Sequence, residues 1–190
     1  MDLRDRIIDA ATRLYCEVGF RGATTRRIAS EAGVNEVTLF RHFGSKETLL
    51  REAVCRGWSA VCYPLLPMPA TDPAAELQSW AALYTEGTRQ AASFIRVRMA
   101  EFEEHRELIP PGGSPPARAT AMVAEYLEGL KAAGRARADF NPQTAASMLV
   151  GSLFADALIR EGMPDMYQNR PEESVAEYVR LFLRAIGVDQ

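Results

Sequence analysis

The residues that most often carry catalysis or bind metals are scarce in this chain and are not spaced for either task. The chain has two histidines, His42 and His105, and three cysteines, none of them in a Cys-x-x-Cys pair. No His, Cys and Glu positions follow the spacing of a zinc site, and neither a phosphate-binding glycine loop nor a nucleophile elbow is present. We therefore expect no enzyme activity and no metal or cofactor. An all-helical enzyme that converts a small molecule is the rival that this scarcity disfavours.

Residues 24–43 carry a different chemistry. Two short predicted helices joined by a glycine turn have the dimensions of a helix-turn-helix. At 100° per residue, Val37, Thr38 and Arg41 share one face of the second helix, and Leu39 and Phe43 share the opposite, inward face. An arginine in a major groove can bind guanine through two hydrogen bonds, and a valine can contact a thymine methyl group. The pattern indicates DNA recognition.

Cations near the starts of two predicted helices support the same interpretation. A capping box that begins at Thr24 would place Glu or Gln at position 27, but the chain has Arg26 and Arg27 there, and Lys46 lies in the first turn of a later helix. Cations at this end of a helix dipole cost a few tenths of a kcal/mol unless an anion binds there. DNA phosphates are such anions. The alternative is that these are ordinary solvated charges.

The elements that position these residues are all predicted to be helices. Apolar residues make up 47% of the 190 positions and charged residues 25%, as in ordinary globular proteins. Helical periodicity covers almost the whole chain, no alternating strand pattern is convincing, and no apolar run is long enough to span a membrane. We expect an all-α fold with about nine helices, at 4–18, 24–32, 35–43, 46–62, 74–87, 89–108, 116–133, 143–161 and 172–187.

Local signals predict where the first helices begin and end. Ile7, Ala11, Leu14 and Val18 define the buried face of the first helix, which Gly19 ends. Thr24, Asn35 and Ser45 are predicted N-caps, and Gly33 and Gly44 end the two short helices.

The net charge of −3 hides an uneven distribution. Residues 1–46 hold eight basic and six acidic groups, whereas the remaining 144 hold 14 basic and 19 acidic groups. Such asymmetry between the two ends suggests two modules with different partners.

Residues 4–50 resemble the TetR family of bacterial transcription regulators without a gap. The segments that carry the resemblance are Ile7–Ala11, Leu14-Tyr15, Val18–Phe20, Ala23–Thr25, Ile28-Ala29, Ala32–Val34, Thr38–Phe43 and Ser45–Leu50. The resemblance implies a three-helix DNA-binding domain at 1–46 with its helix-turn-helix at 24–43. It also implies a six-helix domain at 47–190 that binds an effector and dimerises.

The resemblance and the residue chemistry together give the predicted DNA contacts. These are Thr24, Thr25, Arg26, Arg27, Asn35, Glu36, Val37, Thr38, Phe40, Arg41, His42 and Lys46. The family usually has Tyr where this chain has Phe40, and often Gly where it has Val37, so operator specificity does not transfer. Glu36 is unfavourable beside phosphates, although it can accept a hydrogen bond from cytosine N4.

The larger C-terminal part has an apolar, aromatic and methionine-rich helical body, which is typical of an ordinary core and, in this family, of an effector site. The predicted ligand-binding residues are Trp58, Trp80, Tyr84, Phe94, Arg98, Met99, Phe102, Met122, Tyr126 and Phe154. Arg98 falls within an apolar arc that includes Phe94, Met99 and Phe102, and a buried cation needs a partner. Asp156, Glu101 or a ligand carboxylate can fill that role.

The last two helices are predicted to form a homodimer interface. Small residues are frequent at 144–158, and the terminal helix is apolar around more than half of its circumference. The predicted interface residues are Leu149, Leu153, Ala157, Tyr178 and Phe182. A monomer core with more layers is the alternative.

The sparse cysteines and the charged N-terminal residues predict a cytoplasmic protein without a signal peptide or membrane contact. Cys55 and Cys62 are predicted to lie on the same face of a helix. They are either buried structural thiols or a redox sensor. The most favoured function is a homodimeric repressor that an unknown small, largely apolar or organic-anion effector releases from a palindromic double-stranded operator. The alternative is an effector-independent activator or architectural DNA-binding partner.

Overall fold

The computed structural model describes residues 2–58, 61, 63–105, 108 and 113–188, and these form two compact units. The described residues contain nine α-helices and no strand, which confirms the predicted all-α fold. None of the helices in these residues is long and apolar enough to cross a membrane.

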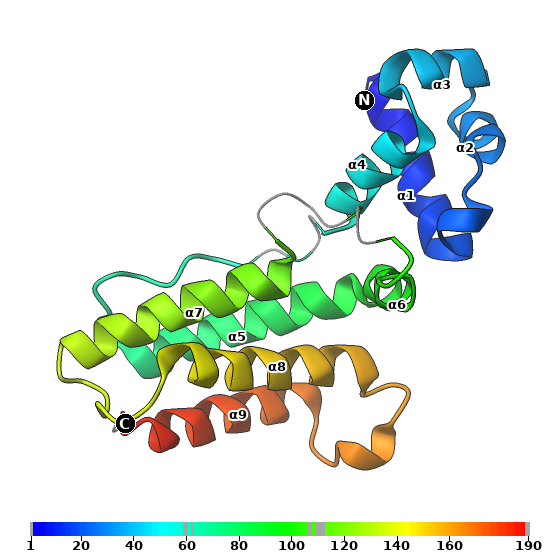
Figure 1. Cartoon of the computed structure of the whole chain (residues 1–190). Coiled ribbons are helices and arrows are strands. Elements are labelled where there is room, and N and C mark those ends of the chain that lie inside the picture. Colours follow the sequence, from blue (N-terminus) through cyan, green and yellow to red (C-terminus); the bar gives the residue numbers. More distant parts are fainter. Residues whose placement is uncertain (1, 59–60, 62, 106–107, 109–112, 189–190) are drawn as a thin grey trace. The chain divides into compact units, whose positions relative to one another are not determined.

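The first unit contains residues 1–60 and 91–114 and holds the helix-turn-helix. Its helices are α1 (Leu3–Gly22), α2 (Thr25–Ala32), α3 (Glu36–Phe43), α4 (Lys46–Trp58) and α6 (Ala92–Ala100). The long α1 packs against α2, α4 and α6, and α3 packs against α2 and α4 (Figure 1). Packing thus joins α4 and α6 to the DNA-binding helices, because Leu49, Leu50 and Ile95 are fully buried. The predicted domain boundary at residue 46 follows the helix-turn-helix motif, whereas the packed unit also contains α4 and α6.

Side-chain caps begin the short helices where the sequence predicts them. The Thr24 hydroxyl accepts a hydrogen bond from the Arg27 amide at 3.3 Å, the Asn35 Oδ1 from the Thr38 amide at 2.8 Å, and the Ser45 hydroxyl from the Thr48 amide at 3.1 Å. Gly33 ends α2 in the left-handed conformation, with φ of 67°.

The end of α1 differs from the prediction. Gly19 interrupts the helix as expected, with φ of 66° and ψ of −173°, but helical structure resumes and extends to Gly22. Val18 was predicted to face the core and is 39% exposed, so that prediction is wrong. The residue beside it one turn later is Gly22, which has no side chain to cover it: a Cβ added there would lie 2.6 Å from the Val18 Cβ.

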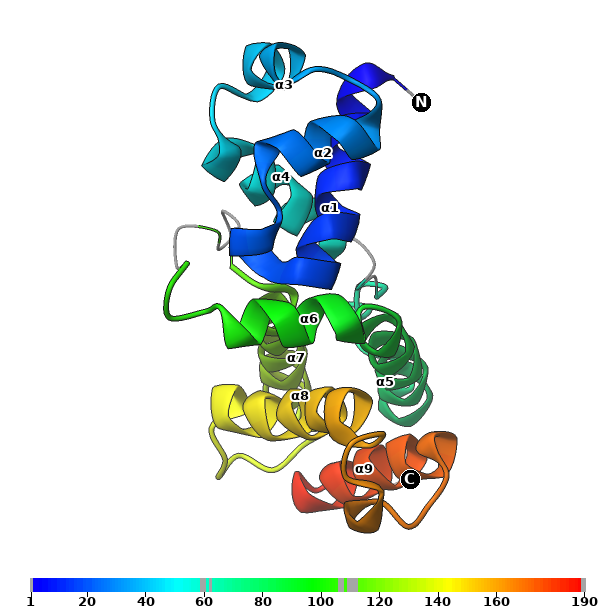
Figure 2. The same ribbon diagram turned by 90° about the vertical axis from the view of Figure 1, so that its right-hand side faces the viewer.

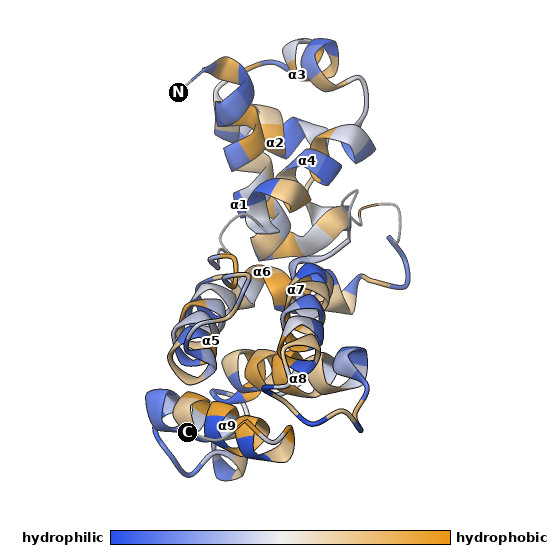
Figure 3. Cartoon of the chain, turned by 90° about the vertical axis from the view of Figure 1, so that its left-hand side faces the viewer, coloured by the Kyte–Doolittle hydropathy of each residue, from blue (hydrophilic) through white to orange (hydrophobic). Residues whose placement is uncertain are grey.

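The second unit contains residues 61–90 and 115–190. Its helices are α5 (Pro73–Gln90), α7 (Pro115–Ala132), α8 (Pro142–Ile159) and α9 (Pro171–Ala185), with a short 3₁₀ helix at Pro164–Met166. α8 packs against α5, α7 and α9, and α9 also packs against α5 (Figure 2). Apolar residues are concentrated along α8 (Figure 3), which agrees with its central position among the four helices.

Two predicted helices are too long. The helix expected at 89–108 is replaced by the end of α5 at Gln90 and by α6, which stops at Ala100. The four residues after Ala100 include Glu101, Glu103 and Glu104. Negatively charged side chains are unfavourable at the C-terminal end of a helix, where the helix dipole is negative, so they disfavour a longer helix. α4 ends at Trp58 rather than at Cys62, and Cys62 itself lies outside the described residues.

Candidate DNA-binding surface and effector region

The exposed face of α3 has the composition that the sequence predicts. Val37 is 76% exposed, Arg41 and His42 are also exposed, and Phe40 is 44% exposed. On the other face, Leu39 is fully buried and Phe43 is 5% exposed. The predicted inward face of this helix is therefore confirmed.

Polar side chains fix α3 on its neighbour. The Asn35 Oδ1 accepts a second hydrogen bond, from the Thr38 hydroxyl at 2.8 Å, and the Thr25 hydroxyl donates to the Glu36 carboxylate at 2.7 Å. The second bond ties α2 to α3 and gives Glu36 a partner within the protein. A contact of Glu36 with cytosine stays a prediction.

Three exposed arginines lie on the helix-turn-helix. Arg27 donates to the Gly22 carbonyl at 3.2 Å. Within the described part of the chain, Arg26 and Arg41 have no ion-pair partner. Guanidinium groups that the protein leaves unpaired on this surface suit phosphate oxygens and guanine edges.

Lys46 has an internal partner that the sequence did not indicate. Its ammonium group donates to the Phe20 carbonyl at 2.6 Å and lies 4.4 Å from the centre of the Phe20 ring. Burial lowers the pKa of Lys46, which the nearby Glu47 and Glu101 partly oppose. A lysine in the first turn of α4 therefore needs no DNA phosphate to explain it, and its phosphate contact stays a prediction.

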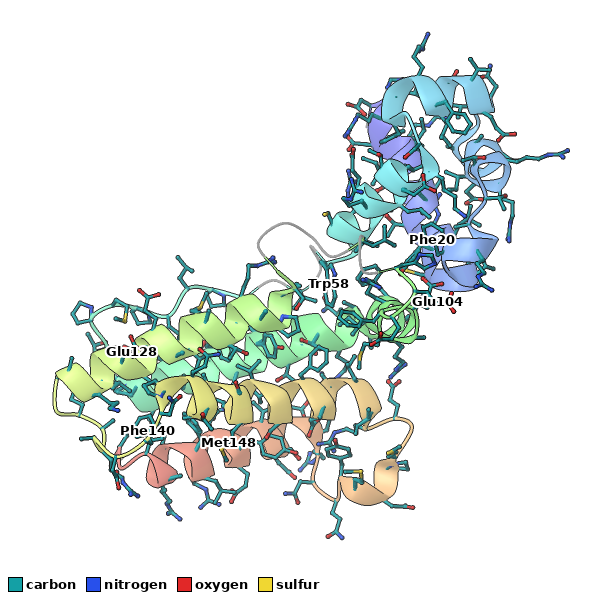
Figure 4. The ribbon with its side chains drawn as sticks, viewed as in Figure 1. Phe20, Trp58, Glu104, Glu128, Phe140 and Met148 are labelled. Atoms are coloured by element: carbon teal, nitrogen blue, oxygen red, sulfur yellow. The ribbon has the colours of Figure 1, made fainter. Side chains whose placement is uncertain are left out.

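Phe20 also joins α1 to the residues that follow α6. The Glu101 carboxylate accepts a hydrogen bond from the Phe20 amide at 2.6 Å, and the His105 ring stacks on the Phe20 ring with centroids 3.7 Å apart. Arg21 and Glu104 form an exposed ion pair at 3.0 Å beside this contact; Figure 4 labels Phe20 and Glu104. The C-terminal end of α1 is thus held from both α4 and the α6 side.

Arg98 is buried, as predicted, but Glu101, the proposed partner in its own unit, does not pair with it. It is 3% exposed, donates to the His105 carbonyl at 3.0 Å, and keeps one guanidinium nitrogen without a hydrogen-bond partner. Asp156 instead forms a two-bond pair with Arg160, at 2.9 and 2.5 Å, and Glu101 accepts from Phe20. Asp156 thus has a charge partner one helical turn along the chain, which the sequence analysis did not identify, and its pairing with Arg98 stays a prediction.

The predicted ligand-binding residues are divided between the two units. In the first unit, Trp58 and Phe94 are buried and meet edge to face with centroids 5.2 Å apart. Met99 and Phe102 are 59% and 44% exposed, so their predicted place on a buried arc is wrong. Phe102 lies beyond the end of α6 at Ala100, so helical spacing no longer places it on that arc. Met99 lies within α6, whose buried face at Phe94, Ile95 and Arg98 is narrower than the predicted arc.

In the second unit, Trp80, Tyr84 and Tyr126 are buried, and Met122 and Phe154 are half-buried. Trp80 and Tyr84 stack on α5, with ring centroids 5.2 Å apart and planes 7° apart. The Tyr126 hydroxyl donates to the Glu76 carboxylate and is therefore already occupied.

Tyr63 lies edge-on to both stacked rings and was not among the predicted site residues. The sequence signal for it was its aromatic ring, which belongs to the aromatic body of the C-terminal part.

The predicted dimer residues divide between the interior of the second unit and one apolar groove on its surface. Leu149, Leu153 and Ala157 are 2%, 0% and 6% exposed, because α8 turns this face toward α5, α7 and α9 of the same chain. An open apolar groove of about 290 Å³ lies along α8 and α9, and three of the five predicted dimer residues, Leu149, Tyr178 and Phe182, line it. Its lining residues are Met148, Leu149, Ser152, Tyr178, Leu181, Phe182 and Ala185. Figure 4 labels Met148, which is 67% exposed.

No group of His, Cys, Asp and Glu in the described residues is arranged to hold a metal ion. Of the two cysteines of the predicted same-face pair, Cys55 is half-buried and Cys62 lies outside the described residues. A redox role for this pair stays a prediction.

The arrangement of α1 to α4 is that of a helix-turn-helix regulator, and two family models cover most of the chain. The model of bacterial regulatory proteins of the tetR family matches residues 7–53, and that of the AefR-like transcriptional repressor C-terminal domain matches residues 80–188. The chain belongs to the TetR family and is a DNA-binding transcriptional regulator.

Relatives and solved structures agree with this assignment. The chain is 25% identical to the uncharacterized HTH-type transcriptional regulator YvkB of Bacillus subtilis over 185 residues, 97% of either chain. Against class D tetracycline repressor protein from Escherichia coli it is 43% identical over 47 residues, which are 25% of this chain and 22% of that one. The chain is also similar to the solved structure of the flavonoid-responsive regulator FrrA, with 25% sequence identity and a TM-score of 0.74. The match covers 96% of this chain and 96% of that one.

Proposed function

We propose that this regulator is a homodimeric repressor that binds a palindromic operator and is released by a small, largely apolar or organic-anion ligand. One observation carries the proposal: α3 is capped by the Asn35 side chain and presents Val37 and Arg41 to solvent. A branched apolar group and an unpaired guanidinium group on one short helix are suited to reading base edges in the major groove. Thr24, Arg26 and Arg27 at the start of α2 then contact phosphates.

The α8–α9 groove supports the homodimer. An exposed apolar surface bounded by Met148 and Leu181, which are 67% and 53% exposed, is typical of a surface that another protein covers. A twofold contact between copies of this groove buries the same residues of both chains. It also gives the operator its symmetry, because two α3 helices about one DNA turn, ~34–36 Å, apart read two half-sites.

Buried aromatic residues in both units support control by a ligand. A solved relative, FrrA, is described as flavonoid-responsive and is similar to this chain over 96% of its length. A ligand releases the operator only if it binds the DNA-bound and free conformations with different affinities. A repressor of this kind requires that difference.

Selection of bound sequences from a random double-stranded DNA pool tests the proposal. We expect enrichment of an inverted repeat, bound by two chains per duplex as measured by mass photometry. A single asymmetric site bound by one chain would contradict the homodimer. Repression is tested by placing the selected operator across a promoter in an in vitro transcription assay, where added protein lowers transcript yield; increased transcript yield favours the activator alternative.

A further inference from the structure

The Glu36 carboxylate lies where two helices of the candidate DNA-binding surface begin. Glu36 is the first residue of α3, and its carboxylate accepts a hydrogen bond at 2.7 Å from the hydroxyl of Thr25, the first residue of α2. Both side chains are half-buried, so the bond holds the carboxylate beside the start of α2. A negative charge is therefore fixed next to the residues that we propose contact phosphates.

No cation among the described residues forms an ion pair with this carboxylate. Arg26 and Arg27 directly follow Thr25 in the chain, but neither pairs with Glu36. Arg27 donates instead to the Gly22 carbonyl at 3.2 Å. The partner of the carboxylate is thus a neutral hydroxyl, and its negative charge is not paired within the protein.

The fold requires only part of the chemistry of this side chain. The hydrogen bond from the Thr25 hydroxyl needs an acceptor oxygen, which a neutral glutamine amide supplies as well as a carboxylate does. A negative charge in the first turn of a helix is favourable, so α3 tolerates the carboxylate. The charge therefore acts chiefly on the DNA that this surface binds.

The hydrogen-bonding groups of the bases determine which DNA tolerates a carboxylate. An ionised carboxylate has acceptors and no donor. In the major groove cytosine presents an amino donor at N4 and adenine one at N6, whereas guanine and thymine present the acceptors N7, O6 and O4. A fixed carboxylate is therefore compatible with an amino-bearing base and is repelled by guanine, thymine and phosphate. Cytosine suits it best, because adenine also presents the N7 acceptor.

We propose that Glu36 is a specificity-determining residue, which weakens binding to any DNA that does not place an amino-bearing base, above all cytosine, opposite its carboxylate. The inference rests on the proposed reading of base edges by α3 and adds a class of base that each half-site must contain. Specificity is a difference between two affinities, so repulsion of wrong sequences raises it as attraction of the right one does. Sequence-independent binding depends on phosphates, and there nothing offsets the repulsion.

Binding to DNA of random sequence is the first test, and it needs no known operator. Glu36→Gln keeps an acceptor for Thr25 and removes the charge, so we expect it to bind a short random duplex about fivefold more tightly. The slope of log affinity against log salt concentration should steepen by about one unit per chain. Glu36→Ala should steepen the slope equally, since it removes the charge without adding an amide. Fluorescence anisotropy over a series of salt concentrations measures both quantities.

Glu17→Gln is the matched control for net charge. Glu17 is exposed on α1 of the same unit, three positions before Phe20, and forms no ion pair with any residue that the structure describes. The substitution removes the same charge, and we expect it to leave the salt slope as it is. A gain in random-duplex affinity as large as that of Glu36→Gln would attribute the effect to net charge and reject the proposal. An unaltered slope in both Glu36 variants would place the carboxylate out of reach of DNA and reject it too.

Selection of bound sequences from a random pool is the second test. We expect the unmodified chain to enrich cytosine or adenine at one position of each half-site, and Glu36→Gln to accept all four bases there, because an amide both donates and accepts. If the unmodified chain enriches an operator and the variant keeps the same base preference, this inference fails and the proposed function stands. If the unmodified chain enriches no sequence, the proposed function fails, while the random duplex still decides whether Glu36 repels DNA.

Discussion

Arg41 is exposed on α3 and has no ion-pair partner among the described residues, so its contribution to DNA recognition is directly testable. Arg41→Ala is expected to relax the preference at one base pair of each half-site by about 1–3 kcal/mol, because a two-bond contact with guanine is lost. Fluorescence anisotropy on a panel of single-base operator variants measures this. Arg96→Ala removes another exposed arginine of the first unit and serves as the control. A uniform loss of affinity over all variants would show that Arg41 contacts phosphate instead.

Glu76 gives a prediction for stability against pH. Burial raises the pKa of this carboxyl, but hydrogen bonds from Tyr126, Asp72 and Thr71 outweigh it and lower the pKa from 4.5 to about 2. A carboxyl whose pKa is lowered in the folded state stabilises the fold above its unfolded pKa, and this stabilisation is lost as the pH falls toward the folded value.

The Glu76→Gln variant is therefore expected to be less stable than the unmodified chain at pH 6, and the difference should shrink between about pH 4.5 and 2. Urea unfolding of both proteins at a series of pH values measures it. Glu125→Gln, at an exposed position on α7, is the control with no such trend. A difference that stays constant down to pH 2 would contradict the assignment.

At the scale of residues, the sequence did not predict which distant residues each side chain contacts. Helical spacing correctly identified Arg98 as buried. Periodicity shows which face of a helix a residue lies on, but it does not show which residue it contacts. Lys46 shows the same limit, since its acceptor is a main-chain carbonyl 26 positions away and any residue type can provide one. The exposed α3 residues were predictable because both their face and their solvent exposure follow from one short amphipathic pattern.

At the scale of elements, helix starts were predicted more accurately than helix ends. Asn35 and Asn141 illustrate the reason: each caps its helix through its own side chain, so the signal is local to the sequence. The end of α6 depends on a tertiary contact as well as on acidic residues, because Glu101 turns to bind the Phe20 amide. No local pattern shows that contact.

Gly19 tests how far this contact fixes the break in α1. With φ of 66° and ψ of −173° its backbone is in a region used almost only by glycine, and an added Cβ would lie 2.3 Å from the Glu101 carboxylate. Gly19→Ala should therefore lower the free energy of unfolding by more than the ~1–2 kcal/mol of a left-handed alanine alone. Gly134→Ala is a matched control, since Gly134 also has positive φ, 67°, but open space around it. Chemical denaturation of both variants measures the difference, and equal losses would show that Glu101 moves aside without cost.

At the scale of the whole molecule, the distribution of charge along the chain is a better guide to DNA binding than the net charge. The net charge is −3, yet residues 1–46 carry two more basic than acidic groups. So small an excess gives weak sequence-independent attraction to DNA, which comes mainly from phosphate neutralisation. Specific contacts must therefore supply most of the operator affinity, and in the proposed homodimer the pairing of two chains adds to them.

The α8–α9 groove is the surface on which the proposed homodimer can be tested. Met148→Glu places a carboxylate on an exposed residue of the groove, and burial of two such charges across a twofold interface is strongly unfavourable. We expect a shift from dimer to monomer in sedimentation velocity, together with loss of binding to the full palindrome, while circular dichroism shows an unchanged helix content. Met99→Glu is the matched control, because Met99 is similarly exposed, at 59%, but lies on α6. A Met148→Glu protein that remains dimeric would place the interface on another surface, and the symmetry of the operator would then need a different explanation.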